Sequence, residues 1–169
     1  MPRTLVQAGC FLFGVWIALM LCPLAVEVAR ADDDAPYAEL ETHLFNEVNA
    51  VRTRHHLIPL QRAPELDAIA RSHSRDMARR NYLSHQTPEG SNPLDRIQRA
   101  GVVGFTLAAE NLGKTDRSNP SQEIVFHWLR STDHRRNLLA PPFNGTGIGI
   151  ARAPDGSLVY TQLYVSVPR

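Results

Sequence analysis

The apolar positions predict two long helices in the first part of the chain. Residues 38–56 carry an apolar stripe at helical spacing, formed by Leu40, Leu44, Val48 and Val51. A second stripe follows Pro64, a residue that suits the first position of a helix, and Asn81 is a suitable end for it. This stripe consists of Leu66, Ile69, Ala70, His73 and Met77. Each helix therefore has one face to bury against another layer.

Shorter elements are predicted in the middle of the chain. In order, they are a loop over 82–92, a short helix over 93–100, a mostly apolar segment over 102–109 and a short helix over 134–139. The apolar segment is expected to be either a strand or irregular structure. Asn119 and Pro120 form a typical helix start, with Gln122 reaching back as a cap. Trp128 lies on the apolar face of that helix, so we expect it to be buried.

The C-terminal part of the chain predicts a β-hairpin. The turn signals Asn144-Gly145 and Asp155-Gly156 bracket the segment 146–152, and an apolar segment over 158–165 follows. The glycines of the first segment are expected to allow close approach of another backbone. Helices and strands do not alternate as in a parallel sheet, which favours an α+β fold with a small antiparallel sheet covered by helices.

The first residues of the chain have the features of a secretory signal. Arg3 precedes the uncharged run 9–26, and the tripeptide that ends at Ala31 has the small residues that signal peptidase requires. We expect cleavage there and a mature chain beginning at Asp32, in a secreted or periplasmic protein. The alternative is a protein anchored in the membrane by residues 9–26, a run just long enough to cross a bilayer.

This division gives a signal peptide over 1–31, a short acidic leader over 32–37 and one domain over 38–169. Both cysteines lie in the first segment, so the mature chain has no disulfide. The hydrophobic share of 43% and the net charge of +1 are typical of a globular chain and indicate no nucleic-acid partner. The sequence also contains no P-loop, G-x-S-x-G, H-E-x-x-H or G-x-G-x-x-G motif.

Two of the seven histidines stand out as candidates for chemistry. The other five are expected at the surface or, for His73 on its apolar stripe, in the hydrogen-bonded core. His85 lies in a loop and His134 at a helix boundary, where functional side chains tend to sit. Glu110 follows an apolar segment and would reach the same cleft. Two imidazoles and a carboxylate can bind Zn²⁺ or transfer protons.

Short motifs spread along the chain carry a family resemblance. They are Asn49-x-x-Arg52, His73-x-x-Asp76-Met77, Ser84-His85, Glu110-Asn111, Trp128-x-x-Ser131-x-x-His134-Arg135-x-Asn137, Gly147-Ile-Gly149 and Tyr160-Thr-Gln162. Over about residues 38–167 the chain resembles the CAP superfamily, which comprises cysteine-rich secretory proteins, antigen 5 and pathogenesis-related 1 and is also called the SCP domain. It is most similar to the cysteine-free bacterial branch.

The resemblance implies an α-β-α sandwich, with a small antiparallel sheet between helical layers. It also implies a central cleft lined by two histidines and two acidic residues, which binds a divalent metal such as Zn²⁺ in some members. Carried over to this sequence, the cleft residues are His85, Glu110 and His134, with Asn111 beside them. Ser131 stands where many eukaryotic relatives have the second acid, which puts four-residue metal binding in doubt.

Three hypotheses for function stay open, because the resembled family has no single activity. The first is a secreted, non-enzymatic protein that binds a ligand or an extracytoplasmic partner through the cleft. The second is a metal-dependent hydrolase, with Glu110 as base and His85 and His134 as metal ligands. The third is a purely structural polar cluster that joins loops to the core. Neither a catalytic residue nor a cofactor other than the divalent metal is assigned.

Overall fold

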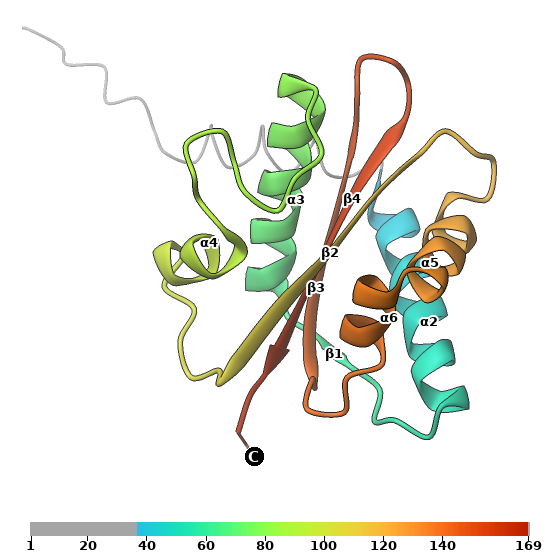
Figure 1. The fold of residues 1–169 in the computed structure, drawn as a ribbon, viewed down its shortest axis with the longest axis vertical. Helices are drawn as coiled ribbons and strands as arrows, with labels where there is room; N and C mark the ends of the chain where they lie inside the picture. The colour runs from blue at the N-terminus through green and yellow to red at the C-terminus, as the bar shows by residue number, and fades with distance from the viewer. Residues whose placement is uncertain (1–36, 169) are drawn as a thin grey trace, which may run out of the picture.

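The computed structural model describes residues 37–168, which fold into helical layers on both sides of a sheet (Figure 1). The helices are α2 (Ala38–Arg54), α3 (Pro64–Arg80), α4 (Pro93–Arg99), α5 (Pro120–Arg130) and α6 (Thr132–Leu138). The strands are β1 (Gln61–Arg62), β2 (Leu107–Thr115), β3 (Gly145–Arg152) and β4 (Leu158–Ser166). The predicted signal peptide lies outside the described residues.

The sheet has the strand order β1-β3-β4-β2. The predicted hairpin of β3 and β4 is confirmed, with Ile148 opposite Gln162. Strand β2 lies antiparallel to β4 and places Glu110 opposite Leu163. Strand β1 runs parallel to β3, so the sheet is mixed and not fully antiparallel. This two-residue strand escaped prediction because it is too short to show any alternation of apolar and polar positions.

Each face of the sheet is covered by its own helical layer (Figure 1). Helices α2, α5 and α6 cover one face, over a core that includes Leu44, Val48, Trp128, Ile148 and Tyr164. Helices α3 and α4 cover the other face, over a core that includes Leu66, Ile69, Ala70, Ile97 and Leu163. The expected α-β-α sandwich of the α+β class is therefore confirmed.

Two glycines of β3 let helix α3 lie directly on the sheet. A Cβ atom at Gly147 would overlap the backbone of Leu66, and one at Gly149 would overlap the backbone of Arg71. Any larger residue would therefore push the helix away from the strand. This contact holds α3 and the loop that follows it in a fixed position over the sheet.

The Asn49-x-x-Arg52 motif fixes the chain after α2. The Asn49 amide pairs with the backbone of Leu60 in both directions, at 2.8 and 3.1 Å. The buried Arg52 guanidinium donates to the carbonyls of Leu138 and Phe143, each at 2.8 Å. Burial lowers the pKa of Arg52. These residues hold separate loops together and have a structural role.

The structure corrects two local predictions. The segment 102–109, expected as a strand or as irregular structure, is irregular up to Thr106, and its strand begins at Leu107 and continues through Thr115. Val103 in the irregular part is 84% exposed. The pattern of apolar residues did not predict the position of β2, because several residues buried in this strand are polar and are hydrogen-bonded to other elements. The predicted cap of α5 is also wrong, because Asn119 makes no side-chain cap and Gln122 contacts Glu47 at 3.3 Å instead.

Candidate functional site

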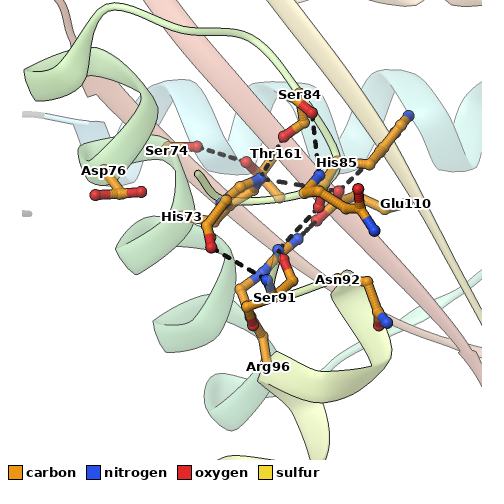
Figure 2. Close-up of polar contacts among 12 residues, drawn as sticks. His73, Ser74, Asp76, Ser84, His85, Ser91, Asn92, Arg96, Glu110 and Thr161 are labelled. Carbon is orange, nitrogen blue, oxygen red and sulfur yellow. Dashed lines mark hydrogen bonds and ion pairs between the residues drawn. The ribbon is translucent and has the colours of Figure 1, made fainter. Parts of the chain in front are cut away.

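Three elements meet around the carboxylate of Glu110 (Figure 2). Strand β2 supplies Glu110, the loop after α3 supplies His85, and α4 supplies Arg96. Glu110 Oε1 lies 2.8 Å from His85 Nδ1, and Glu110 Oε2 accepts from Arg96 Nη2 at 2.6 Å. The Glu110 side chain is only 1% exposed. Both oxygens of a buried carboxylate are thus bonded to groups from other elements.

The His85 imidazole is anchored at one nitrogen and accessible to solvent. A carboxylate only accepts hydrogen bonds, so in this pairing His85 Nδ1 carries the proton. The other ring nitrogen, Nε2, takes no part in this bond. The side chain is 51% exposed, in contrast to its buried partner. The arrangement therefore presents a positioned imidazole at the surface.

His73 lies below this pair, as a core histidine. Its side chain is fully buried, and its Nε2 bonds the carbonyl of Ser84 at 3.0 Å. The same nitrogen is 4.0 Å from Glu110 Oε1. Burial lowers the pKa of His73, and this outweighs the opposing effect of the nearby Glu110 carboxylate. The expectation of a hydrogen-bonded core histidine is confirmed.

His134 is held beside strand β2 through its backbone. Asn111 Nδ2 donates to the His134 carbonyl at 3.0 Å, and Asn111 Oδ1 accepts from Asn137 Nδ2 at 3.0 Å. Asn137 also donates to the Glu110 carbonyl at 3.1 Å. The buried Asn111 therefore joins β2 to α6 and positions His134 relative to Glu110. Asn111 was expected among the residues lining the cleft, whereas its buried side chain connects two elements of the fold.

Burial and two charged side chains act on the pKa of His134. Burial lowers the pKa of His134, and the positive form of His85 lowers it further, while Asp133 opposes both effects. A carboxylate near two imidazoles is by itself expected to favour their protonated forms. That expectation is wrong for His134, because burial and its histidine neighbour dominate.

The missing second acid has no replacement in this part of the fold. Ser131 marks the start of α6, where its carbonyl accepts from the backbone of Arg135 at 2.9 Å, and its side chain makes no cap. The nearby Asp133 is 78% exposed and pairs with Arg136 at 3.0 Å. The structure thus brings His85 and Glu110 into contact, sets His134 near them, and leaves Ser131 and Asp133 without a bond to the cluster.

This donor set does not fit a hydrolytic zinc centre. Such centres use three protein ligands and a separate base. The oxygens of Glu110 are already bonded to His85 and Arg96, so the carboxylate is not available as either. Within residues 37–168, no group of three or more histidine, cysteine or acidic side chains is arranged to hold a metal ion.

Sequence reasoning missed Arg96 as the second partner of Glu110. A single arginine in a seven-residue helix forms no motif. The signal appears only when the fold buries Glu110, because a buried carboxylate requires a charged or hydrogen-bonding partner. Arg96 also donates to the carbonyls of His85 and Ser91, at 3.0 and 3.1 Å, so it holds the loop that carries His85.

Known proteins resemble the chain over this whole region. It matches the model of the cysteine-rich secretory protein family, CAP, over residues 45–164. The uncharacterised protein YkwD of Bacillus subtilis strain 168 is 32% identical over 145 residues, which cover 85% of this chain and 54% of the relative. A second Bacillus subtilis relative, the uncharacterised membrane protein YlbC, is 30% identical over 140 residues, which cover 80% of this chain and 38% of that protein.

Solved structures share the fold. An outer surface protein of Borrelia burgdorferi superposes with a TM-score of 0.71 at 20% identity, covering 78% of this chain and 96% of that protein. An extracellular protein from Bacillus anthracis strain Ames that contains an SCP domain has a TM-score of 0.63 at 35% identity. That match covers 74% of this chain and 39% of the larger protein.

The chain spans about half the length of YkwD and less of YlbC, so the similarity concerns one domain of longer proteins. The family match covers most of the residues that the structure describes, including every element from α3 to β3. The chain belongs to the cysteine-rich secretory protein (CAP) family.

Proposed function

We propose that this protein acts outside the cytoplasm as a binding protein, which takes a ligand or partner at the surface formed by His85 and His134 above Glu110. The observation that carries the proposal is the contrast within the His85–Glu110 pair. The carboxylate is 1% exposed and the imidazole is 51% exposed, although they are 2.8 Å apart. A buried charge that orients an exposed side chain is the usual way to prepare a polar contact for a ligand.

The structural hypothesis accounts for only part of this cluster. The bonds of Glu110, Arg96 and Asn111 join loops and helices to β2, as a structural network would. A network of that kind does not require His85 to be half exposed, nor a second imidazole beside it. Loop residues held by a rigid scaffold are the common setting for binding. Binding therefore explains more of the geometry than stability alone.

The hydrolase hypothesis has less support. It needs Glu110 as a free base, whereas both carboxylate oxygens are bonded. One structural neighbour has been solved with Zn²⁺, but at 10% identity and a TM-score of 0.56 it shows the fold alone. We therefore treat a divalent ion as a candidate ligand of the two imidazoles and not as a hydrolytic cofactor.

A location outside the cytoplasm is supported by the sequence and by the relatives. The N-terminal segment has the pattern of a cleaved signal, and the similar Bacillus anthracis protein is described as extracellular. Among the described helices, none combines the length and hydropathy needed to cross a bilayer. N-terminal sequencing of the exported protein tests this part, with Asp32 as the expected first residue. Recovery of the uncut chain in membranes would contradict it.

Fragment binding followed by NMR tests the binding surface. A library of small polar fragments is titrated into ¹⁵N-labelled protein, and the expected shifts cluster on backbone amides around His85 and His134. In His85→Ala these shifts disappear, whereas Arg136→Gln, an exposed control whose side chain pairs with Asp133, retains them. Fragments that bind elsewhere, or that bind His85→Ala equally well, would overturn the proposal. Zn²⁺-dependent ester hydrolysis that Glu110→Gln abolishes would support the hydrolase instead.

A further inference from the structure

A second polar cavity lies where α3, the loop after it and α4 meet. Its volume is about 410 Å³, and its lining includes His73 from α3, Ser91 from the loop, and Arg96 and Arg99 from α4. His85, Glu110 and His134 are not among the lining residues. The cavity is therefore distinct from the surface assigned to binding above, although Arg96 contributes to both.

Three buried polar atoms without partners converge on this cavity. Among the described residues, His73 Nδ1, Ser91 Oγ and Arg96 Nε are buried and make no hydrogen bond, and all three residues line the cavity (Figure 2). The His73 side chain is fully buried, and Ser91 is 6% exposed. An unsatisfied buried polar atom costs about 1–3 kcal/mol, so three in one place favour the binding of a polar group there.

The hydrogen-bonding character of these atoms narrows the class of ligand. The Ser84 carbonyl can only accept, so the proton of His73 is on Nε2. A histidine with the ordinary pKa of about 6.5 is mostly neutral at pH 8, and burial lowers the pKa of His73, so its Nδ1 is an acceptor at that pH. Arg96 Nε is a donor, and the Ser91 hydroxyl serves as either. A ligand that satisfies all three atoms must both accept and donate hydrogen bonds.

The charge of the cavity favours an anion. Arg79 and Arg99 line it, and neither makes a hydrogen bond or an ion pair with residues 37–168. Arg80 adds little, because it pairs with Glu89 at 2.7 Å and with Asp76 at 3.5 Å, and both acids line the cavity. Arginine is well suited to oxyanions, because its planar group donates two parallel hydrogen bonds to their oxygens. The cavity thus combines spare positive charge with one buried acceptor.

We propose that this cavity binds a small oxyanion that retains a hydroxyl group, of which monohydrogen phosphate is the simplest. Its oxygens accept from Arg96 Nε and from the arginines at the rim, and its P–OH donates to His73 Nδ1. Sulfate is matched in size and charge but has no proton to donate at neutral pH. The site therefore distinguishes phosphate from sulfate through a single acceptor atom.

Calorimetric titration of the protein at pH 8 with phosphate, sulfate and methyl phosphate tests the proposal. Phosphate is expected to bind with one site per chain, and the other two dianions about tenfold more weakly or worse, since both lack the hydroxyl at this pH. If phosphate does not bind at millimolar concentration, the proposal is overturned. The hydrogen bonds of the three buried atoms would then be made by ordered water. Equal binding of all three anions would also overturn the proposal, because it would show that the cavity attracts anions through its positive charge alone.

Variants separate the two features of the site. His73→Gln keeps an amide N–H for the Ser84 carbonyl and places no acceptor at the position of Nδ1, because the glutamine oxygen lies further along the side chain. The preference for phosphate over sulfate should therefore be lost. Arg99→Gln should weaken both anions equally, by about tenfold. Arg136 is an exposed arginine on α6, and Arg136→Gln should change neither the binding of phosphate nor that of sulfate. Circular dichroism checks that each variant is folded. If His73→Gln is unfolded, Ser91→Ala takes its place, and Ser91→Ala is expected to bind phosphate more weakly than the wild-type protein. Unchanged binding in the folded variants would refute the assignment.

Discussion

Glu110 joins β2 to the loop after α3 and to α4 through its two oxygens. A carboxylate that is 1% exposed has lost its hydration, and the bonds to His85 and Arg96 offset that cost. Removing its charge would leave the Arg96 guanidinium, 11% exposed, without its counter-charge. At the scale of single residues, Glu110 thus positions His85 and also holds α4 and the loop after α3 against β2.

Glu110→Gln should reduce the free energy of unfolding by about 3–5 kcal/mol, the usual effect of breaking a buried ion pair. Chemical denaturation followed by tryptophan fluorescence measures the change. The matched control is Glu89→Gln, which breaks the exposed pair with Arg80 and should change stability little. Equal effects of the two variants would show that Glu110 is not a structural partner of Arg96.

At this scale the sequence predicted the residues that carry motifs and missed those that only the fold defines. His85 and Glu110 were identified from a loop position and a family resemblance, and they are in contact. Arg96 was missed because it becomes a partner of Glu110 only when α4 packs against β2. The orphaned Nδ1 atom of His73 was equally beyond prediction, since it depends on which hydrogen bonds the fold leaves unmade.

Strand β2 is an edge strand whose outer side is covered by side chains of α5 and α6. The Leu112 carbonyl accepts from Trp128 Nε1 at 2.7 Å, and the Glu110 carbonyl accepts from Asn137 at 3.1 Å. These bonds occupy acceptors that would otherwise pair with another strand. They also tie α6, and with it His134, to the strand that carries Glu110.

Trp128→Ala should lower the free energy of unfolding by about 3–5 kcal/mol, the range for a buried large aromatic residue. The side chain is 2% exposed, and its loss also leaves the Leu112 carbonyl without a donor. Phe126→Ala on the same helix, 54% exposed, is the control and should have a small effect. Similar denaturation midpoints for the two variants would mean that α5 does not pack as described.

At the scale of elements, periodicity predicted the helices well and strand β2 poorly. The first helix ends at Arg54 instead of His56, and α6 begins at Thr132 instead of His134. These differences are small because a helical stripe spans several turns. Strand β2 was misplaced because its buried positions include Glu110 and Asn111, whose burial depends on partners from other elements.

At the scale of the whole molecule, the sandwich brings together segments that are far apart in the sequence. The sheet places β2 between the loop after α3 on one side and α6 on the other (Figure 1). Local patterns contain no information on this arrangement, so the family resemblance supplied it in advance. The same arrangement buries His73 and partly buries His134, and the protonation of both is then coupled to folding.

Stability should fall as the pH is lowered below about 6.5, the ordinary pKa of histidine. Burial lowers the pKa of His73 in the folded state, so the unfolded chain binds a proton first. The stability that neutral His73 contributes is complete above pH 6.5 and is lost as the pH falls towards the folded pKa. Urea denaturation between pH 7.5 and pH 5 measures this loss, which His73→Gln should reduce and His43→Gln, an exposed control, should not. An identical pH dependence in all three proteins would contradict it.

The central claim is that the loop after α3, strand β2 and helix α6 form one site, and the titration of His134 tests it most directly. In the wild-type protein, NMR of the imidazole should give a pKa for His134 below the ordinary 6.5, owing to burial and to His85. In His85→Ala the pKa of His134 should rise towards that value, and in His43→Ala it should not change. A pKa of His134 that is the same with and without His85 would show that the two imidazoles do not share a site.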